Sequence, residues 1–113
     1  MNKDDLIRLH YMLDAAREAT SFAQNRNRSD LDSDRMLALS LLKLIEIIGE
    51  AAATVSKESR LQAPQIPWAS IVGMRNRLVH AYFDIDLDRV WDTVTADLPP
   101  LISELEQIIS SGN

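Results

Sequence analysis

The residues of this chain that could do chemistry gather in one short run, residues 73–86, which reads GMRNRLVHAYFDID. A guanidinium can hold two oxygens of a phosphodiester at once. An imidazole that titrates near neutral pH can add or remove a proton at a ribose hydroxyl. The run is therefore a candidate site for phosphate chemistry, and its polar members are Arg75, Asn76, Arg77, His80 and Tyr82.

Cleavage of RNA without a metal would need only these groups. A base removes the ribose 2′-hydroxyl proton, the oxygen attacks the adjacent phosphorus, and an acid protonates the departing 5′-oxygen. His80 can serve in either role, Arg75 can stabilise charge on the non-bridging oxygens, and Asn76 can orient the imidazole or bind a phosphate oxygen. We expect no metal and no cofactor, because His10 lies far from His80 and no carboxylate–histidine set has recognisable ligand spacing.

The composition limits what can position these groups. A chain of 113 residues with 46% hydrophobic content is long enough for one domain, residues 1–113, and too short for two separate cores. It has no cysteine, no secretory leader and no long apolar run, so we expect a reduced cytoplasmic protein. A formal charge of −5 argues against broad electrostatic capture of nucleic acid. Any such chemistry must use a small local basic cluster.

Apolar residues with helical spacing predict two long helices in the first half of the chain. The first should start near Asp4, which suits a helix N-terminus, and run to about Gln24. A polar connection over residues 25–33 follows. The second helix should end near Lys57, and its start can be capped by Asp32, Ser33 or Asp34. Its apolar face is wider than one neighbouring helix would cover, so it should lie centrally or meet a second subunit.

The second half of the chain predicts a loop and two further helices. Two prolines put the loop over residues 59–67, and a short third helix should span residues 68–78. Asp86 can cap a fourth helix, whose apolar positions continue over residues 87–108. That pattern passes unbroken through prolines 99–100, which predicts one long helix bent or loosened there. The fold class is therefore all-α, an antiparallel four-helix bundle with a short helix that carries the motif.

A straight helix would not bring Arg75 and His80 together, because residues five apart lie about 140° apart around the axis. Asn76 and His80, four apart, would share a face. Two arrangements would solve the problem: the helix loosens before His80, or two copies of the segment meet across a dimer axis and form a composite cleft. The broad apolar face of the second helix favours the dimer. Beyond the helix end, His80 and Tyr82 could point the same way in an extended chain.

Arg75, His80 and Tyr82 match the Arg-x4-His-x-Tyr motif of the HEPN superfamily, and the wording MRNRLVHAYFDID closely resembles its HepT-like toxin branch. The segment IEIIGEAA in the second helix is similar to that branch too. The resemblance implies a HEPN-like helical bundle that forms a homodimer and is an endoribonuclease needing no metal. It also implies a partner, a minimal nucleotidyltransferase antitoxin that adds AMP to the motif tyrosine.

Carried over by position, the resemblance gives individual residues their roles. Arg75 and His80 would be catalytic, Asn76 would be the polar residue that follows the arginine, and Tyr82 would carry the AMP. The protein would then be the toxin of a type VII-like toxin–antitoxin pair that cuts tRNA or mRNA and is silenced at Tyr82. Arg77 could contact RNA, but an exposed arginine near many acids more often forms a solvated ion pair.

Two other functions stay open from the residues alone. The chain could be a helical module that binds a nucleotide or RNA without cutting it, or an interaction partner of a nucleotidyltransferase with the motif as its interface. We interpret Trp68 and Trp91 as core residues and not as platforms for base stacking. Glu46 and Glu50 share a helix face and could reach the basic cluster, although helix solubility explains them nearly as well.

Overall fold

The protein is all-helical over the residues that its structure, a computed structural model, describes: 1–80 and 84–111. This confirms the predicted fold class. The described elements are, in chain order, α1 (Lys3–Ala23), α2 (Asp30–Ser33), α3 (Arg35–Thr54), α4 (Lys57–Gln62), α5 (Trp68–Val72), α6 (Met74–Leu78), α7 (Leu87–Asp92), the π-helical turn η2 (Thr93–Asp97) and α8 (Leu98–Ser111). No helix among them is long and apolar enough to cross a membrane.

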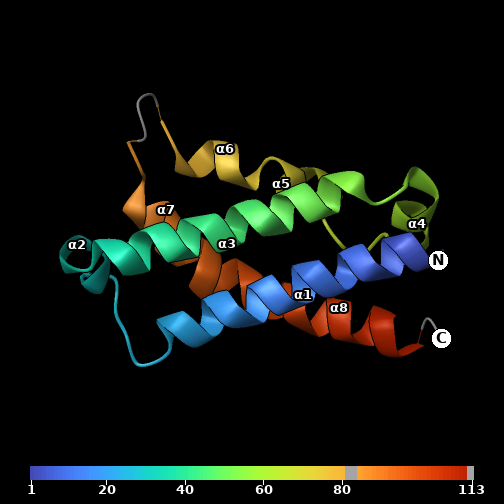
Figure 1. The fold of residues 1–113 in the computed structure, drawn as a ribbon, viewed down its shortest axis with the longest axis horizontal. Coiled ribbons are helices and arrows are strands. Elements are labelled where there is room, and N and C mark those ends of the chain that lie inside the picture. Colours follow the sequence, from blue (N-terminus) through green and yellow to red (C-terminus); the bar gives the residue numbers. More distant parts are fainter. Residues whose placement is uncertain (81–83, 112–113) are drawn as a thin grey trace.

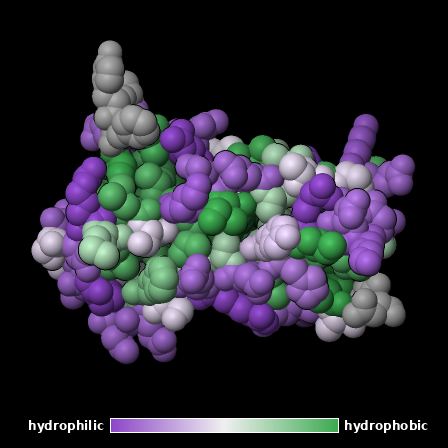
Figure 2. All heavy atoms as spheres, in the orientation of Figure 1, coloured by the Kyte–Doolittle hydropathy of each residue, from purple (hydrophilic) through white to green (hydrophobic). Residues whose placement is uncertain are grey.

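The helix α3 lies at the centre of the bundle. It runs antiparallel to α1 on one side and packs against α5 and α6 on the other, while α8 packs along α1 (Figure 1). The two-sided packing explains the wide apolar face that the sequence shows for this helix. Polar side chains cover much of the face drawn in Figure 2, with apolar patches between them. Trp68 is 9% exposed and belongs to the core, as predicted, and Trp91 packs against the core half-buried.

The helix α1 matches its predicted span closely. Asn2 caps it by accepting a hydrogen bond from the backbone N–H of Asp5 (2.8 Å). The polar connection predicted over residues 25–33 is wrong in part, because α2 forms within it. Asp30 accepts a hydrogen bond from the Asn27 N–H, and Leu31 is only 2% exposed, so local capping and burial fold this turn.

The boundary between α3 and α4 differs from the prediction. Asp34, one of three predicted caps, caps α3 by accepting from the Leu37 N–H (3.1 Å). The helix ends at Thr54 and not near Lys57, because Ser56 caps α4. The loop predicted over residues 59–67 is therefore wrong up to residue 62. The physical reason is long-range: Asp5 of α1 accepts hydrogen bonds from Ser56 and Ser59, which fixes the first turn of α4.

The predicted third helix is two short helices, α5 and α6, that meet at Gly73. The second of them ends at Leu78, because Val79 is extended (φ −124°, ψ 124°). Val79 forms an isolated antiparallel bridge with Ile85. The motif therefore starts on a helix, and His80 lies beyond the helix end.

The last helical run is continuous from α7 through η2 to α8, as predicted. Asp86 caps α7 by accepting from the Arg89 N–H (3.2 Å). The π-helical turn comes just before the prolines, and the Leu98 N–H donates to the Thr93 carbonyl across it. Residues 99–100 follow at the start of α8, where prolines have no N–H to donate and their rings crowd the preceding turn, which the wider π-helical turn accommodates. The loosening of the helix thus sits one turn before the prolines.

Candidate functional site

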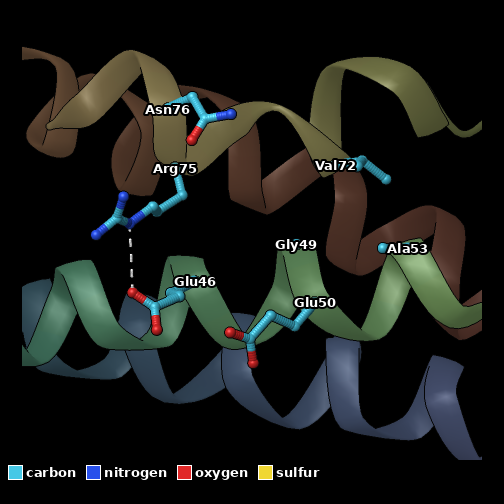
Figure 3. A pocket seen from close by; sticks show the side chains of 7 residues that line it. All are labelled: Glu46, Gly49, Glu50, Ala53, Val72, Arg75 and Asn76. Atoms are coloured by element: carbon cyan, nitrogen blue, oxygen red, sulfur yellow. Dashed lines mark ion pairs between the residues drawn. The ribbon is translucent and has the colours of Figure 1, made fainter.

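Arg75 and Asn76 line a cavity of about 370 Å³ between α3 and the α5–α6 pair (Figure 3). Two helices approach closely here because α3 has a glycine at the contact: a Cβ on Gly49 would lie 3.2 Å from the Ile71 carbonyl oxygen. The close approach brings α6 over the polar face of α3. The cavity is lined by Glu46, Gly49, Glu50, Ala53, Val72, Arg75 and Asn76.

The guanidinium of Arg75 is held at this cavity by a carboxylate. Its Nε lies 3.4 Å from Oε2 of Glu46, and the two side chains are 40% and 28% exposed. Glu46 also pairs with Lys43 (3.3 Å). The terminal nitrogens of Arg75 face away from Glu46 in Figure 3, which leaves them placed for the oxygens of a phosphodiester. Glu46 thus reaches the basic cluster, one of the two roles that the sequence left open for it.

Arg77 points elsewhere and has a structural contact. Its Nη2 donates to the Ser70 carbonyl (2.9 Å) and to the Ser70 hydroxyl (3.3 Å). These bonds tie α6 back to α5 across Gly73. Arg77 is not among the residues that line the cavity of Arg75.

His80 lines a second cavity, of about 310 Å³, on the segment between α6 and α7. Its side chain is 59% exposed, and its Nε2 lies 3.9 Å from Oδ2 of Asp86. The backbone holds the residue in place, because the His80 N–H donates to the Asp84 carbonyl (2.8 Å). The lining residues are Arg28, His80, Asp84, Ile85, Asp86, Leu87 and Asp88.

Arg28 is a cation of this second cavity that the sequence did not reveal. It forms ion pairs with Asp88 of α7 and with Asp32 of α2 (3.2 Å), and these carboxylates raise the pKa of its guanidinium. Arg28 lies in the stretch predicted to be a polar connection, 60 positions before Asp88. No local signal in the sequence points to a contact at that separation.

Arg75 and His80 line different cavities within one chain. The helix does end before His80, as one of the two predicted arrangements requires. Even so, the imidazole of His80 and the guanidinium of Arg75 do not line the same cavity. Tyr82, the predicted site of AMP addition, lies outside the described residues. Within ranges 1–80 and 84–111, no group of three or more His, Cys, Asp or Glu side chains is arranged to hold a metal ion.

The arrangement presents two half-sites for phosphodiester chemistry. One has a guanidinium and an amide at the mouth of a cavity, which suits an anionic phosphoryl group. The other has an exposed imidazole next to a carboxylate, which suits proton transfer. A reaction that needs both would require them to meet around one phosphodiester.

Comparison with known proteins gives a family match over most of the chain. Residues 12–108 match the family model described as "Ribonuclease HepT-like". The chain is 32% identical over 107 residues to "Putative RNase MJ1380" of Methanocaldococcus jannaschii, covering 94% of this chain and 98% of that protein. It is 34% identical over 79 residues to "Probable ribonuclease HepT" of Thermococcus cleftensis, covering 70% and 72%. No solved structure matches significantly.

Proposed function

Because this chain belongs to the HepT-like ribonuclease family, we propose that it is a metal-independent endoribonuclease that acts through Arg75 and His80. The proposed biological role is the toxin of a type VII-like toxin–antitoxin pair, acting in the cytoplasm on tRNA or mRNA. The observation that carries the proposal is that one motif places the guanidinium of Arg75 and the amide of Asn76 at a cavity and, beyond the helix end, an exposed imidazole next to a carboxylate.

The proposed reaction divides the chemistry between the two half-sites. Arg75 binds the non-bridging oxygens and stabilises the charge that develops on them, and Asn76 donates a further hydrogen bond. His80 removes the proton of the 2′-hydroxyl or returns one to the 5′-oxygen as it leaves. Positioning and charge stabilisation then supply most of the rate enhancement, since no covalent enzyme intermediate is required.

We propose that two copies of the chain complete the site as a homodimer. In one chain the two half-sites line separate cavities, and three apolar side chains are exposed: Val72 by 38%, and Met36 by 80% and Leu39 by 43% on α3, at ten- and seven-residue spacings that share the helix face of Glu46. Val72 lines the Arg75 cavity itself. Apolar residues around a polar cavity suit an isologous interface, and such an interface would place the His80 of one copy at the Arg75 of the other.

The proposed partner is a minimal nucleotidyltransferase antitoxin that adds AMP to Tyr82. Support comes from the motif, in which Tyr82 follows His80 by two positions. An adenylyl group would add a phosphodiester anion and a bulky base at the motif, and so occupy the place of the substrate. A Tyr82→Phe toxin should escape chemical neutralisation, and intact mass after incubation with the partner and ATP reports the modification.

The direct test of the proposed activity uses the two histidines of the chain. His80→Ala should abolish RNA cleavage, with EDTA present throughout, while leaving the helical circular-dichroism spectrum unchanged. His10→Ala is the matched control, because His10 is exposed on α1 and lines neither half-site. Full activity of the His80 variant, or loss of the wild-type activity in EDTA, would contradict the proposal.

The separation of the two half-sites within one chain also fits a second function, binding of RNA or a nucleotide without cleavage. In that case binding would depend on the guanidinium of Arg75 and not on the imidazole of His80. Arg75→Ala would weaken binding in calorimetry with short RNA, His80→Ala would not, and wild-type protein would yield no cleavage product.

A further inference from the structure

The two chain segments that flank the undescribed residues 81–83 are paired through their backbones. Val79 bridges to Ile85, the His80 N–H donates to the Asp84 carbonyl, and the Asp86 N–H donates to the Leu78 carbonyl (both 2.8 Å). His80 is thus opposite Asp84, and Asp86 lies two positions further along. In an antiparallel pair such diagonal neighbours share a face, within reach of long side chains. The pairing therefore places the carboxylate of Asp86 on the imidazole's side.

Asp86 is held in place before any substrate arrives. Its Oδ1 accepts from the Arg89 N–H as the cap of α7 (3.2 Å), and its Oδ2 lies 3.4 Å from the Arg89 Nε. The side chain is 28% exposed, against 59% for His80. The carboxylate is therefore the less exposed and more firmly held side chain of the pair.

The other charged groups around His80 are less suited to act on it. Arg28, Asp84 and Asp88 line the same cavity, and Asp88 is bound to Arg28. Asp84 is exposed and supplies its backbone carbonyl to the His80 N–H. Within the part of the chain that the structure describes, the imidazole has a side-chain contact with Asp86 alone, whose Oδ2 lies 3.9 Å from its Nε2.

We propose that Asp86 is the positioning residue of His80, holding Nε2 so that Nδ1 is the nitrogen that exchanges a proton with RNA. The inference rests on the proposed catalytic role of His80. Nδ1 gains the 2′-hydroxyl proton when His80 is the base and loses a proton to the 5′-oxygen when it is the acid. In both steps the carboxylate accepts a hydrogen bond from the Nε2–H and so fixes the orientation of the ring. A hydrogen bond between a nitrogen and an oxygen has a length of about 2.9 Å. We therefore expect His80 Nε2 to move about 1 Å toward Asp86 Oδ2 in the RNA complex.

Substitutions at Asp86 can separate positioning from capping. Serine caps a helix about as well as aspartate but is too short to reach the imidazole, whereas alanine does neither. Asp86→Ser should keep the wild-type melting temperature and KM, and lower kcat about tenfold, because Asp86 acts on His80 and not on RNA. Asp86→Ala should lose the same activity and also melt at a lower temperature. Asp92→Ser is the matched control, an exposed carboxylate of α7 that lines neither half-site, and should retain wild-type kcat.

The split between kcat and KM is a readout that capping cannot move. Loss of a cap lowers stability, whereas loss of the contact with His80 lowers kcat at constant KM. Asp86→Asn keeps the side-chain length and an oxygen that can accept a hydrogen bond from Nε2, and it caps a helix as well as serine does, so it should retain more kcat than Asp86→Ser.

The outcomes separate this inference from the proposed function. An active wild type and an inactive His80→Ala variant would uphold the ribonuclease. Wild-type kcat in Asp86→Ser, or an equal loss in Asp92→Ser, would then overturn the role of Asp86. An active His80→Ala variant would instead overturn the proposed function, and with it the premise of this inference.

Discussion

At the scale of single residues, the Arg75–Glu46 contact bears directly on the proposed binding of a phosphate by Arg75. A carboxylate 3.4 Å from the guanidinium orients it but also offsets its charge. The chain carries a net charge of −5, so every anion close to Arg75 weakens capture of RNA. Glu46 should therefore act as a competitor of the substrate phosphate for Arg75.

Glu46→Gln is accordingly expected to tighten RNA binding. A partly exposed ion pair contributes about 0.2–1 kcal/mol, so KM should fall by a factor of about 1.4 to 5, and the gain should shrink at high salt. Steady-state cleavage of a short RNA at two salt concentrations checks this. Glu18→Gln on α1 is the control, since it changes the net charge equally but lines neither half-site. A higher KM in the Glu46 variant would show that orientation of Arg75 outweighs competition.

The sequence predicted the groups of this site but not their neighbours. Arg75, Asn76 and His80 lie within one run, so their chemistry could be inferred from residue types and spacing. Arg28 comes from a segment 60 residues before Asp88, and only the folded chain brings it to the histidine. Contacts of this kind depend on tertiary packing, which helical periodicity does not encode.

At the scale of elements, Asp5 joins the start of α1 to the start of α4. It is 2% exposed and accepts hydrogen bonds from the Ser56 N–H (3.0 Å), the Ser56 hydroxyl and the Ser59 hydroxyl (2.6 Å). Burial raises the pKa of this carboxyl, but the bonds from Ser56 and Ser59 outweigh it, so the pKa lies below its ordinary value. No local pattern in the sequence indicates these bonds, because Ser56 and Ser59 lie more than fifty residues away.

The lowered pKa of Asp5 predicts how stability depends on pH. A carboxyl whose pKa is lower in the folded state stabilises the protein fully above its unfolded value, about 4, and loses this contribution as the pH falls through the folded value. Asp5→Asn should lower the free energy of unfolding at pH 7 by about 1–3 kcal/mol and flatten its decline at acid pH. Urea unfolding at pH 7 and pH 3.5 measures both, with exposed Asp4→Asn as control. Equal curves for the two variants would contradict the assignment.

Gly49 sets the distance between α3 and the helix pair that carries Arg75. A side chain there meets the Ile71 and Val72 carbonyls at 3.2 and 3.6 Å, which are backbone atoms that cannot rotate away. Gly49→Val should therefore lower the free energy of unfolding by about 1–3 kcal/mol. Ala53→Val, exposed on the same helix, should stay within about 0.5 kcal/mol of wild type. Equal denaturation midpoints for the two variants would show that α5 and α6 shift without cost.

At the scale of the whole molecule, the bundle explains why one chain carries two half-sites. Residue 80 lies beyond the end of α6, paired with the segment that leads into α7, whereas residue 75 faces α3. Sequence periodicity anticipated the bundle and the cap at Asp86, but not the break at Gly73 that turns the predicted third helix into two. A second copy across the exposed apolar residues would unite the halves, which is the central claim of this account.

Heterodimers built from two inactive chains test that claim most directly. An Arg75→Ala chain and a His80→Ala chain, co-expressed with different tags and purified as the mixed dimer, would contain one intact composite site out of two. RNA cleavage should therefore return to about half of the wild-type rate, although each homodimer is inactive. The reverse pair, one wild-type chain with one chain that carries both substitutions, should be inactive. Half activity in that reverse pair, with none in the complementing pair, would show that both residues act within one chain.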